Sequence, residues 1–203
     1  MKDYRLTLKR VFDVILSLIL IIILSPCMLF LSILISLTSQ GPIIFQQKRV
    51  GLGGREFNIY KFRTMVCNAE YLLNDFTAEQ QLEFQSICKL KNDPRVTPLG
   101  RILRKTSLDE LPQFLNVLRG EMSIVGPRPV TPEELNKFGD HVDFLLSVKP
   151  GITGLSQISG RNNLPFEHRI QLDLKYIEAC SIYLDVKIVF QTLPMVFSCQ
   201  GAY

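Results

Sequence analysis

Two adjacent carboxylates, Asp109 and Glu110, form the part of the sequence that is best placed for chemistry. Basic clusters lie on both sides of the pair, and Pro112 follows it closely. Because proline lacks a backbone N–H, Pro112 fits a first helical turn. The carboxylates then lie at or just before a helix N-terminus, where the helix dipole favours negative charge. The pair is either catalytic or, in a capping box from Ser107 to Glu110, only a helix start; the spacing is compatible with both.

Arg128 is the second candidate, because it stands between Pro127 and Pro129. Proline fixes its own backbone and confines the preceding residue to extended conformations. The guanidinium is therefore presented from a stiff backbone, as a preorganised phosphate clamp requires. The alternative is a solvated arginine in a rigid surface turn.

Three segments around these residues, 108–113, 116–118 and 122–129, closely resemble the bacterial sugar transferase family, the monotopic phosphoglycosyl transferases. Enzymes of this family move a phosphosugar from a UDP-sugar to polyprenol phosphate on the inner face of the bacterial plasma membrane and release UMP. The resemblance implies the same two substrates here, in the first membrane step of a glycan or glycoprotein pathway.

The resemblance also implies a role for each site residue. A carboxylate that attacks a pyrophosphate meets strong repulsion unless a divalent cation and guanidinium groups neutralise it, and Mg²⁺ suits phosphate oxygens beside one or two carboxylates. Asp109 is expected to bind Mg²⁺ and to form a covalent aspartyl-phosphosugar, and Glu110 to assist proton transfer or acceptor activation. The expected substrate contacts are Arg104, Arg128, Arg161 and Lys61.

Two other functions are compatible with the sequence. A sugar-only glycosyltransferase acting on lipid would release UDP, and a membrane-anchored adaptor would have no activity. The identity of the sugar, the pathway and the oligomeric state are not determined by these residues.

Composition gives broad limits. The 203 residues allow one domain plus an appendage, which we place at 41–203 (cytosolic, catalytic, with interfacial helices) and 1–40 (membrane). A net charge of +4 is too small to indicate nucleic acid and is compatible with an anionic membrane surface. Five scattered cysteines and two histidines favour reduced thiols in the cytosol over a zinc site or a disulfide framework.

The membrane segment is expected in residues 14–37, which carry no charge. As a straight helix of about 24 residues it would measure roughly 36 Å, enough to cross a bilayer, and it is too long for a secretory signal peptide. Pro26 should kink the helix at its centre, and the Ser25 hydroxyl can satisfy local backbone there.

This segment is either one kinked spanning helix or a re-entrant hairpin whose two ends share one face. Cations flank both ends, and the positive-inside rule would keep both flanks cytoplasmic. Small members of the family enter the bilayer through such a Ser-Pro break, so the resemblance adds weight. We favour a re-entrant helix-break-helix at Ser25 and Pro26, in contact with membrane lipids, with the protein on the cytoplasmic face of the bacterial inner membrane.

The remainder predicts an α+β domain of helices around a short sheet, in what looks like the minimal catalytic form of the family. We expect strands at 41–46 and 57–65, joined by a loop at 51–54. Helices are expected at 68–91, from 98 onward, at 131–148, at 166–179 and at 183–197, the last bent or ended by Pro194. The helix from 98 should carry Arg101, Arg104 and Lys105 toward the carboxylates. Asp173 resembles an acidic residue common in the family, and a structural salt bridge is its expected role.

Overall fold

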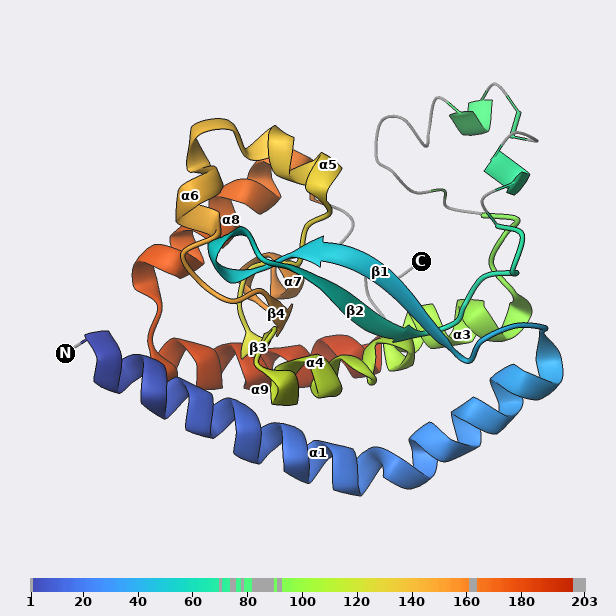
Figure 1. The fold of residues 1–203 in the computed structure, drawn as a ribbon, viewed down its shortest axis with the longest axis horizontal. Coiled ribbons are helices and arrows are strands. Elements are labelled where there is room, and N and C mark those ends of the chain that lie inside the picture. The colour runs from blue at the N-terminus through green and yellow to red at the C-terminus, as the bar shows by residue number, and fades with distance from the viewer. Residues whose placement is uncertain are drawn as a thin grey trace.

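The computed structural model describes residues 2–69, 71–73, 76–77, 79–81, 90, 93–160 and 164–198. Its first element is a helix of 37 residues, α1 (Lys2–Thr38), which runs beneath the rest of the molecule and is bent (Figure 1). The part from Thr7 to Thr38 is long and apolar enough to cross a membrane by length and composition. The protein thus combines a mixed helix and sheet domain with a long apolar N-terminal helix.

The bend of α1 has a local cause. Pro26 lies inside the helix and has no N–H to donate to the carbonyl of Ile22, four residues earlier. The Ser25 hydroxyl donates to that carbonyl oxygen at 2.9 Å. The expectation that Ser25 satisfies the backbone at the proline is confirmed.

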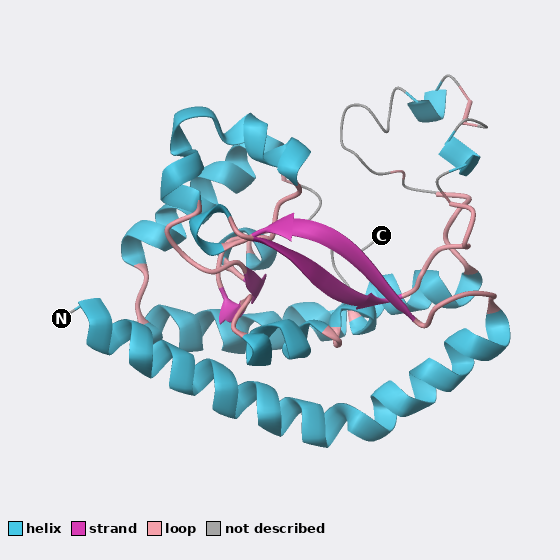
Figure 2. Ribbon diagram, viewed as in Figure 1, coloured by secondary structure: helices cyan, strands magenta, loops and turns pink. Residues whose placement is uncertain are grey.

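The chain then forms a twisted antiparallel hairpin of β1 (Ile44–Val50) and β2 (Glu56–Phe62), shown in magenta in Figure 2. The 3-10 turn η1 (Leu52–Gly54) joins them, with Gly53 and Gly54 at positive φ. Residues 51–54 are therefore a hairpin turn, as expected. β1 extends four residues beyond the expected end at 46, whereas β2 ends at Phe62, three residues before the expected end at 65.

A second strand pair lies deeper in the molecule. β3 (Ser123–Val125) and β4 (Gly151–Thr153) are parallel. Their ends approach so closely that a Cβ on Gly151 would lie 2.1 Å from the backbone nitrogen of Gly126. The expectation of one short sheet is wrong for the described residues, which form two two-stranded sheets.

Helices pack around these strands and enclose the main core. They are α3 (Pro98–Thr106), α4 (Gln113–Arg119), α5 (Pro132–Leu135), α6 (Val142–Leu145), α7 (Leu155–Ile158), α8 (Phe166–Ala179) and α9 (Ile182–Ser198). Short 3-10 segments are η2 (Tyr71–Leu73), η3 (Leu108–Glu110) and η4 (Asn136–His141). Val117, Met122, Val125 and Ile188 are fully buried between α4, the parallel strands and α9.

Two helix predictions need correction. Residues 68–91 do not form one helix, because a turn and η2 occupy their first part, although Thr77 and Gln80 form a capping box within this range. The helix expected at 131–148 is divided into α5, η4 and α6, with Gly139 at φ 52°. Pro194 lies inside α9 and does not end it.

The first part of α1 is fastened to the domain by polar contacts. Asp13, which is 2% exposed, accepts hydrogen bonds from Ser123 Oγ and the Ile124 N–H, each at 3.0 Å. Lys9 forms a 2.5 Å ion pair with Asp185 on α9. Arg10 donates to carbonyls at the C-terminal end of α4.

The last part of α1 is fastened to the same domain. Arg63, just after β2, donates to the carbonyl oxygens of Ser39 at 2.7 Å and Ile35 at 3.3 Å, and also to that of Pro42. Leu31 and Ile35 pack in a cluster with Phe62 and with the leucines of η3 and α3. Both ends of α1 therefore contact one globular body.

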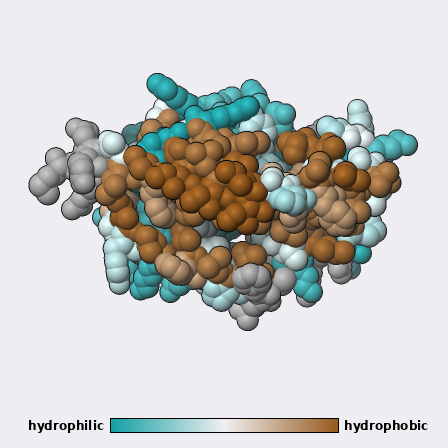
Figure 3. All heavy atoms as spheres, turned by 90° about the horizontal axis from the view of Figure 1, so that it is seen from below, coloured by the Kyte–Doolittle hydropathy of each residue, from teal (hydrophilic) through white to brown (hydrophobic). Residues whose placement is uncertain are grey.

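Between these ends, α1 presents large apolar side chains outward. Figure 3 shows brown side chains across the underside of the molecule, where α1 lies. The exposed apolar residues of the helix include Val11, Ile15, Leu18, Ile19, Ile22, Ile23, Leu29, Phe30, Ile33 and Leu37. Exposed Phe190 and Leu193 on α9 and Ile102 on α3 add apolar surface outside α1.

Candidate active site

The two carboxylates lie in η3, the single turn that connects α3 to α4. Pro112 immediately precedes α4, so both carboxylates lie just before a helix N-terminus, as expected. The capping box is not formed: Ser107 adopts a left-handed conformation (φ 57°), and its side chain makes no capping hydrogen bond. Glu110 instead accepts a hydrogen bond from Lys61 Nζ of β2 at 2.7 Å. The carboxylate of Glu110 is therefore directed to β2 and not to the helix start.

Asp109 is the more deeply buried member of the pair, with 8% of its surface exposed. Burial, followed by the charge of Glu110, raises the pKa of Asp109 to about 6. The positive charges of Lys61 and Arg104 act in the opposite direction. The site thus holds two carboxylates of unequal burial beside two cations.

Arg104 reaches the site from the last turn of α3. Its Nε donates to Thr64 Oγ1 at 2.9 Å, and burial lowers its guanidinium pKa while Asp109 raises it. The close approach of α3 depends on Gly100, where a Cβ would lie 2.1 Å from the Thr64 carbonyl oxygen.

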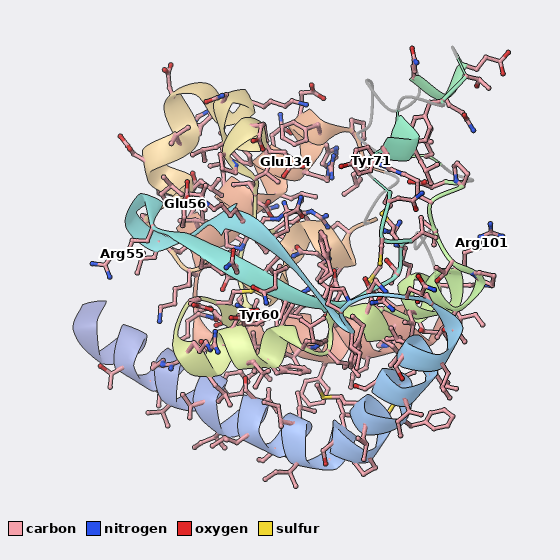
Figure 4. All side chains as sticks on the ribbon, turned by 45° about the vertical axis from the view of Figure 1, so that its right-hand side comes forward. Arg55, Glu56, Tyr60, Tyr71, Arg101 and Glu134 are labelled. Atoms are coloured by element: carbon pink, nitrogen blue, oxygen red, sulfur yellow. The ribbon has the colours of Figure 1, made fainter. Side chains whose placement is uncertain are left out.

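The expectation that three cations of α3 face the carboxylates is wrong in two cases. Arg101 and Lys105 are exposed, and Figure 4 shows Arg101 projecting outward from α3. Positions i, i+3 and i+4 lie on one side of a helix, so the spacing does not distinguish these three cations. Only Arg104 is partly buried, where its Nε donates to Thr64.

A fully buried amide, Asn116 on α4, supports this arrangement. Its Oδ1 accepts from the Tyr60 N–H at 3.0 Å, and its Nδ2 donates to the Asn58 carbonyl at 2.8 Å and to Glu121 at 2.7 Å. It therefore fixes α4 against β2, the strand that carries Lys61. Sequence reasoning did not identify this residue, although it lies in the segment 116–118 that carries the family resemblance.

Arg128 lies within electrostatic range of Arg49 of β1. Arg49 is 9% exposed; it donates to Glu134 at 3.1 Å and to the Pro129 carbonyl at 3.0 Å. Burial lowers the pKa of Arg49, as does the like charge of Arg128, whereas Glu134 and Glu110 raise it. Arg49 therefore lies within electrostatic range of both Glu110 and Arg128.

A shallow open hollow adjoins Arg128. Arg128, Glu134 and Ser156 line it together with side chains of α8, including Arg169 and Asp173. Figure 4 shows Glu134 on the helical layer beyond the hairpin, on the opposite side from α1. The hollow is thus lined by side chains of both charge signs.

The predicted site residues are therefore distributed over two neighbouring places. Lys61, Arg104, Asp109 and Glu110 form one cluster, whereas Arg128 lines the hollow and is linked to that cluster through Arg49. Arg161 lies outside the described residues. Asp173 accepts a hydrogen bond from Ser156 Oγ at 2.7 Å, a partner that the sequence did not indicate.

The donor set can be compared with the needs of a magnesium ion. Among the described residues, no group of three or more His, Cys, Asp or Glu side chains could hold a metal. Mg²⁺ commonly keeps several waters and binds through one or two carboxylates together with substrate phosphates. Asp109 and Glu110 fit that pattern, in which the substrate completes the coordination.

The two leucines on either side of the carboxylates connect η3 to the apolar helix. Leu108 and Leu111 flank Asp109 and Glu110 in sequence and pack in one cluster with Leu31 and Ile35 of α1. The second half of α1 therefore lies against the turn that carries the carboxylates.

Comparison with known proteins is consistent with these features. Residues 4–199 match the family described as "Bacterial sugar transferase". The chain is 45% identical over 199 residues to "Undecaprenyl-phosphate galactose phosphotransferase" of Salmonella typhimurium, which covers 97% of this chain and 42% of the relative. It is 40% identical over 204 residues to "UDP-glucose:undecaprenyl-phosphate glucose-1-phosphate transferase" of Escherichia coli, covering 97% of this chain and 41% of the relative.

A relative of similar length is "Exopolysaccharide production protein ExoY" of Sinorhizobium fredii, which is 43% identical over 198 residues, with 96% of this chain and 88% of the relative covered. By contrast, the chain spans about two fifths of the length of the Salmonella and Escherichia relatives. The family match over nearly the whole chain, together with these identities, shows that the chain belongs to the bacterial sugar transferase family.

Proposed function

We propose that this protein transfers a sugar-1-phosphate from a UDP-sugar to polyprenol (undecaprenyl) phosphate and releases UMP. The observation that carries the proposal is the buried carboxylate Asp109, beside Glu110 and facing Lys61 and Arg104. The names of the Salmonella and Escherichia relatives include undecaprenyl phosphate, and the Escherichia name also includes a UDP-sugar. The substrates proposed here follow those names.

The reaction would proceed in two displacements at one phosphorus. An oxygen of Asp109 attacks the phosphorus that carries the sugar, and the bond to the bridging oxygen breaks, so that UMP leaves with the electron pair. An oxygen of polyprenol phosphate then attacks the same phosphorus, and the bond to Asp109 breaks. The lipid-linked pyrophosphate is the product, and the carboxylate is regenerated.

The charges of the site suit this sequence. A buried carboxylate is poorly solvated and therefore reactive, yet it needs cations beside it to approach a phosphate. Lys61 and Arg104 supply positive charge near Asp109, and Arg128 is proposed to bind a phosphate of the donor. Glu110, held by Lys61, is proposed to assist proton transfer or acceptor activation. Arg161 is proposed as a nucleotide or phosphate contact on the family resemblance alone.

Mg²⁺ is proposed as the cofactor, held by Asp109 beside Glu110. When bound, it would neutralise pyrophosphate oxygens and polarise the phosphorus for attack.

We further propose that α1 enters the bilayer from the cytoplasmic face of the bacterial inner membrane and returns to that face. Both ends of α1 are fastened to one polar domain, through Asp13 at one end and Arg63 at the other. A helix that crossed the membrane would place these two ends on opposite sides. The bend at Pro26 and the outward apolar side chains agree with a re-entrant segment that contacts lipid.

The activity is tested by mixing the protein with Mg²⁺ and UDP-sugar in the absence of acceptor. Intact mass should increase by one phosphosugar, UMP should form at about one equivalent, and Asp109→Asn should abolish both. Release of UDP would indicate the sugar-only transferase. Function retained by Asp109→Asn in complementation would indicate the adaptor.

The topology is tested with single cysteines at positions 4 and 48 in a cysteine-free background. A membrane-impermeant reagent should label both positions from the same, cytoplasmic side. Labelling from opposite sides would contradict the re-entrant proposal. Pro26→Leu should straighten the helix, favour a spanning arrangement and reduce activity.

A further inference from the structure

The backbone around Arg128 is held from two sides by buried charged residues. On one side, Arg49 of β1 donates to the Pro129 carbonyl at 3.0 Å. On the other side, Asp173 of α8 accepts a hydrogen bond from the Arg128 backbone. The two flanking prolines stiffen the segment, and these two contacts fix where the stiff segment lies.

Asp173 is itself held in place. It is 3% exposed, and its carboxylate accepts from Ser156 Oγ of α7 at 2.7 Å. Ser156 is 2% exposed, so the hydrogen bond is shielded from water. A buried carboxylate is costly unless donors satisfy it, and the two donors here come from α7 and from the Arg128 segment.

The charges around Arg128 also favour one position of its guanidinium group. Arg128 and Asp173 line the same hollow, and their opposite charges attract, whereas Arg49 repels Arg128. Glu134 is already occupied by Arg49 at 3.1 Å. The charge of Asp173 therefore draws the guanidinium of Arg128 away from Arg49 and toward the hollow.

We propose that Asp173, oriented by Ser156, is a positioning residue that places Arg128 for binding a phosphate of the donor. This inference rests on the proposed function, because Arg128 must act on the substrate for its position to matter. It gives Asp173 a role in the reaction through Arg128 and not through contact with the substrate.

The test is a double-mutant cycle on UMP release, with kcat and KM for the UDP-sugar measured separately. Asp173→Asn should reduce kcat/KM on the order of 10- to 100-fold, since small misplacements of a binding group have effects of this size. Ser156→Ala should cause a smaller loss in the same direction. In the Arg128→Lys background, Asp173→Asn should cause less than about a twofold further loss, because the group that it positions is already impaired.

The matched control is Asp185→Asn, another buried aspartate, whose partners are Lys9 and Tyr176. Whatever the size of its own effect, the fold-changes in kcat/KM caused by Asp185→Asn and by Arg128→Lys should multiply in the double variant, because the two positions share no partner. If the fold-changes in kcat/KM of Asp173→Asn and Arg128→Lys also multiply in the double variant, the positioning role of Asp173 is wrong. If Asp173→Asn does not fold, the same cycle with Ser156→Ala, which keeps the carboxylate, decides the question.

The outcomes separate this inference from the proposed function. A wild-type protein that releases no UMP would refute the function itself. A wild-type protein that releases UMP, with Arg128→Lys as active as wild type, would refute the role of Arg128 and with it the inference. If Arg128→Lys is impaired but its effect multiplies with that of Asp173→Asn, the inference about Asp173 is refuted and the proposed function stands.

Discussion

Replacing Asp109 by asparagine should stabilise the fold at neutral pH while it abolishes turnover. The carboxylate is 8% exposed, and burial and Glu110 raise its pKa from 3.8 to about 6. In the folded protein the proton is therefore bound more tightly than in the unfolded chain. Asparagine has nearly the shape of the protonated carboxyl group and carries no charge, so it removes the cost of the buried anion.

The size of the effect follows from the shift in pKa. A shift of about 2 units, at about 1.4 kcal/mol per unit, gives a gain in free energy of unfolding of about 3 kcal/mol near pH 7. The tighter proton binding at Asp109 contributes to the stability of the wild-type protein. This contribution is fully present below the unfolded pKa and is lost as pH rises through the folded pKa of about 6. The advantage of Asp109→Asn should therefore decrease to roughly half at pH 5 and to less than about 1 kcal/mol at pH 4.

Thermal unfolding of purified protein in one fixed detergent or nanodisc, at several pH values from 5 to 8, measures this effect. For a chain of this length, 3 kcal/mol corresponds to an increase in Tm of about 6–12 °C. Asp93→Asn is the control: this carboxylate is also buried, and burial acts to raise its pKa, but the hydrogen bonds and charge of Arg95 outweigh burial and lower the pKa. Its removal should therefore lower Tm. A lower Tm for Asp109→Asn at pH 7, or a difference that does not shrink at pH 5, would refute the electrostatic argument.

Three further predictions concern the same site. Arg104→Ala should lower the rate of UMP release on the order of 100-fold, whereas the exposed Arg101→Ala should stay within about twofold of wild type. Arg128→Lys keeps the charge but loses the planar fork, so KM for the UDP-sugar should increase about tenfold in steady-state assays. Glu110→Gln should lose activity with a change in stability below about 1 kcal/mol, measured by thermal unfolding, because its bond to Lys61 is partly exposed and no capping box depends on it.

The sequence predicted those features that depend on neighbours within about four residues. Thr97 caps α3 with Pro98 in the first turn, and Thr131 forms a capping box with Glu134 at the start of α5. The bounds of α8 agree with its apolar period. Each of these features depends on a local hydrogen bond or a local period, so the sequence shows it directly.

Contacts between distant residues were not predictable in this way. Glu110 satisfied the pattern of a capping box, but in the structure its carboxylate accepts from Lys61, which is 49 residues away. Ser107 adopts a left-handed conformation, and its side chain makes no capping hydrogen bond. The same holds for Asn116 and Asn58, which are 58 positions apart. Local patterns compete with such tertiary contacts, and only the folded structure shows which one is made.

The apolar helix was also predictable in composition but not in its contacts. The uncharged run begins at residue 14, whereas α1 begins at Lys2, and its charged first part binds the domain through Asp13. Its second half packs with Leu108 and Leu111, the residues that flank the carboxylates. If α1 lies in the bilayer as proposed, this packing places Asp109 beside the membrane surface. A lipid-borne phosphate would then meet the phosphosugar without the lipid leaving the membrane, and one helix would serve both as the membrane anchor and as a wall of the site.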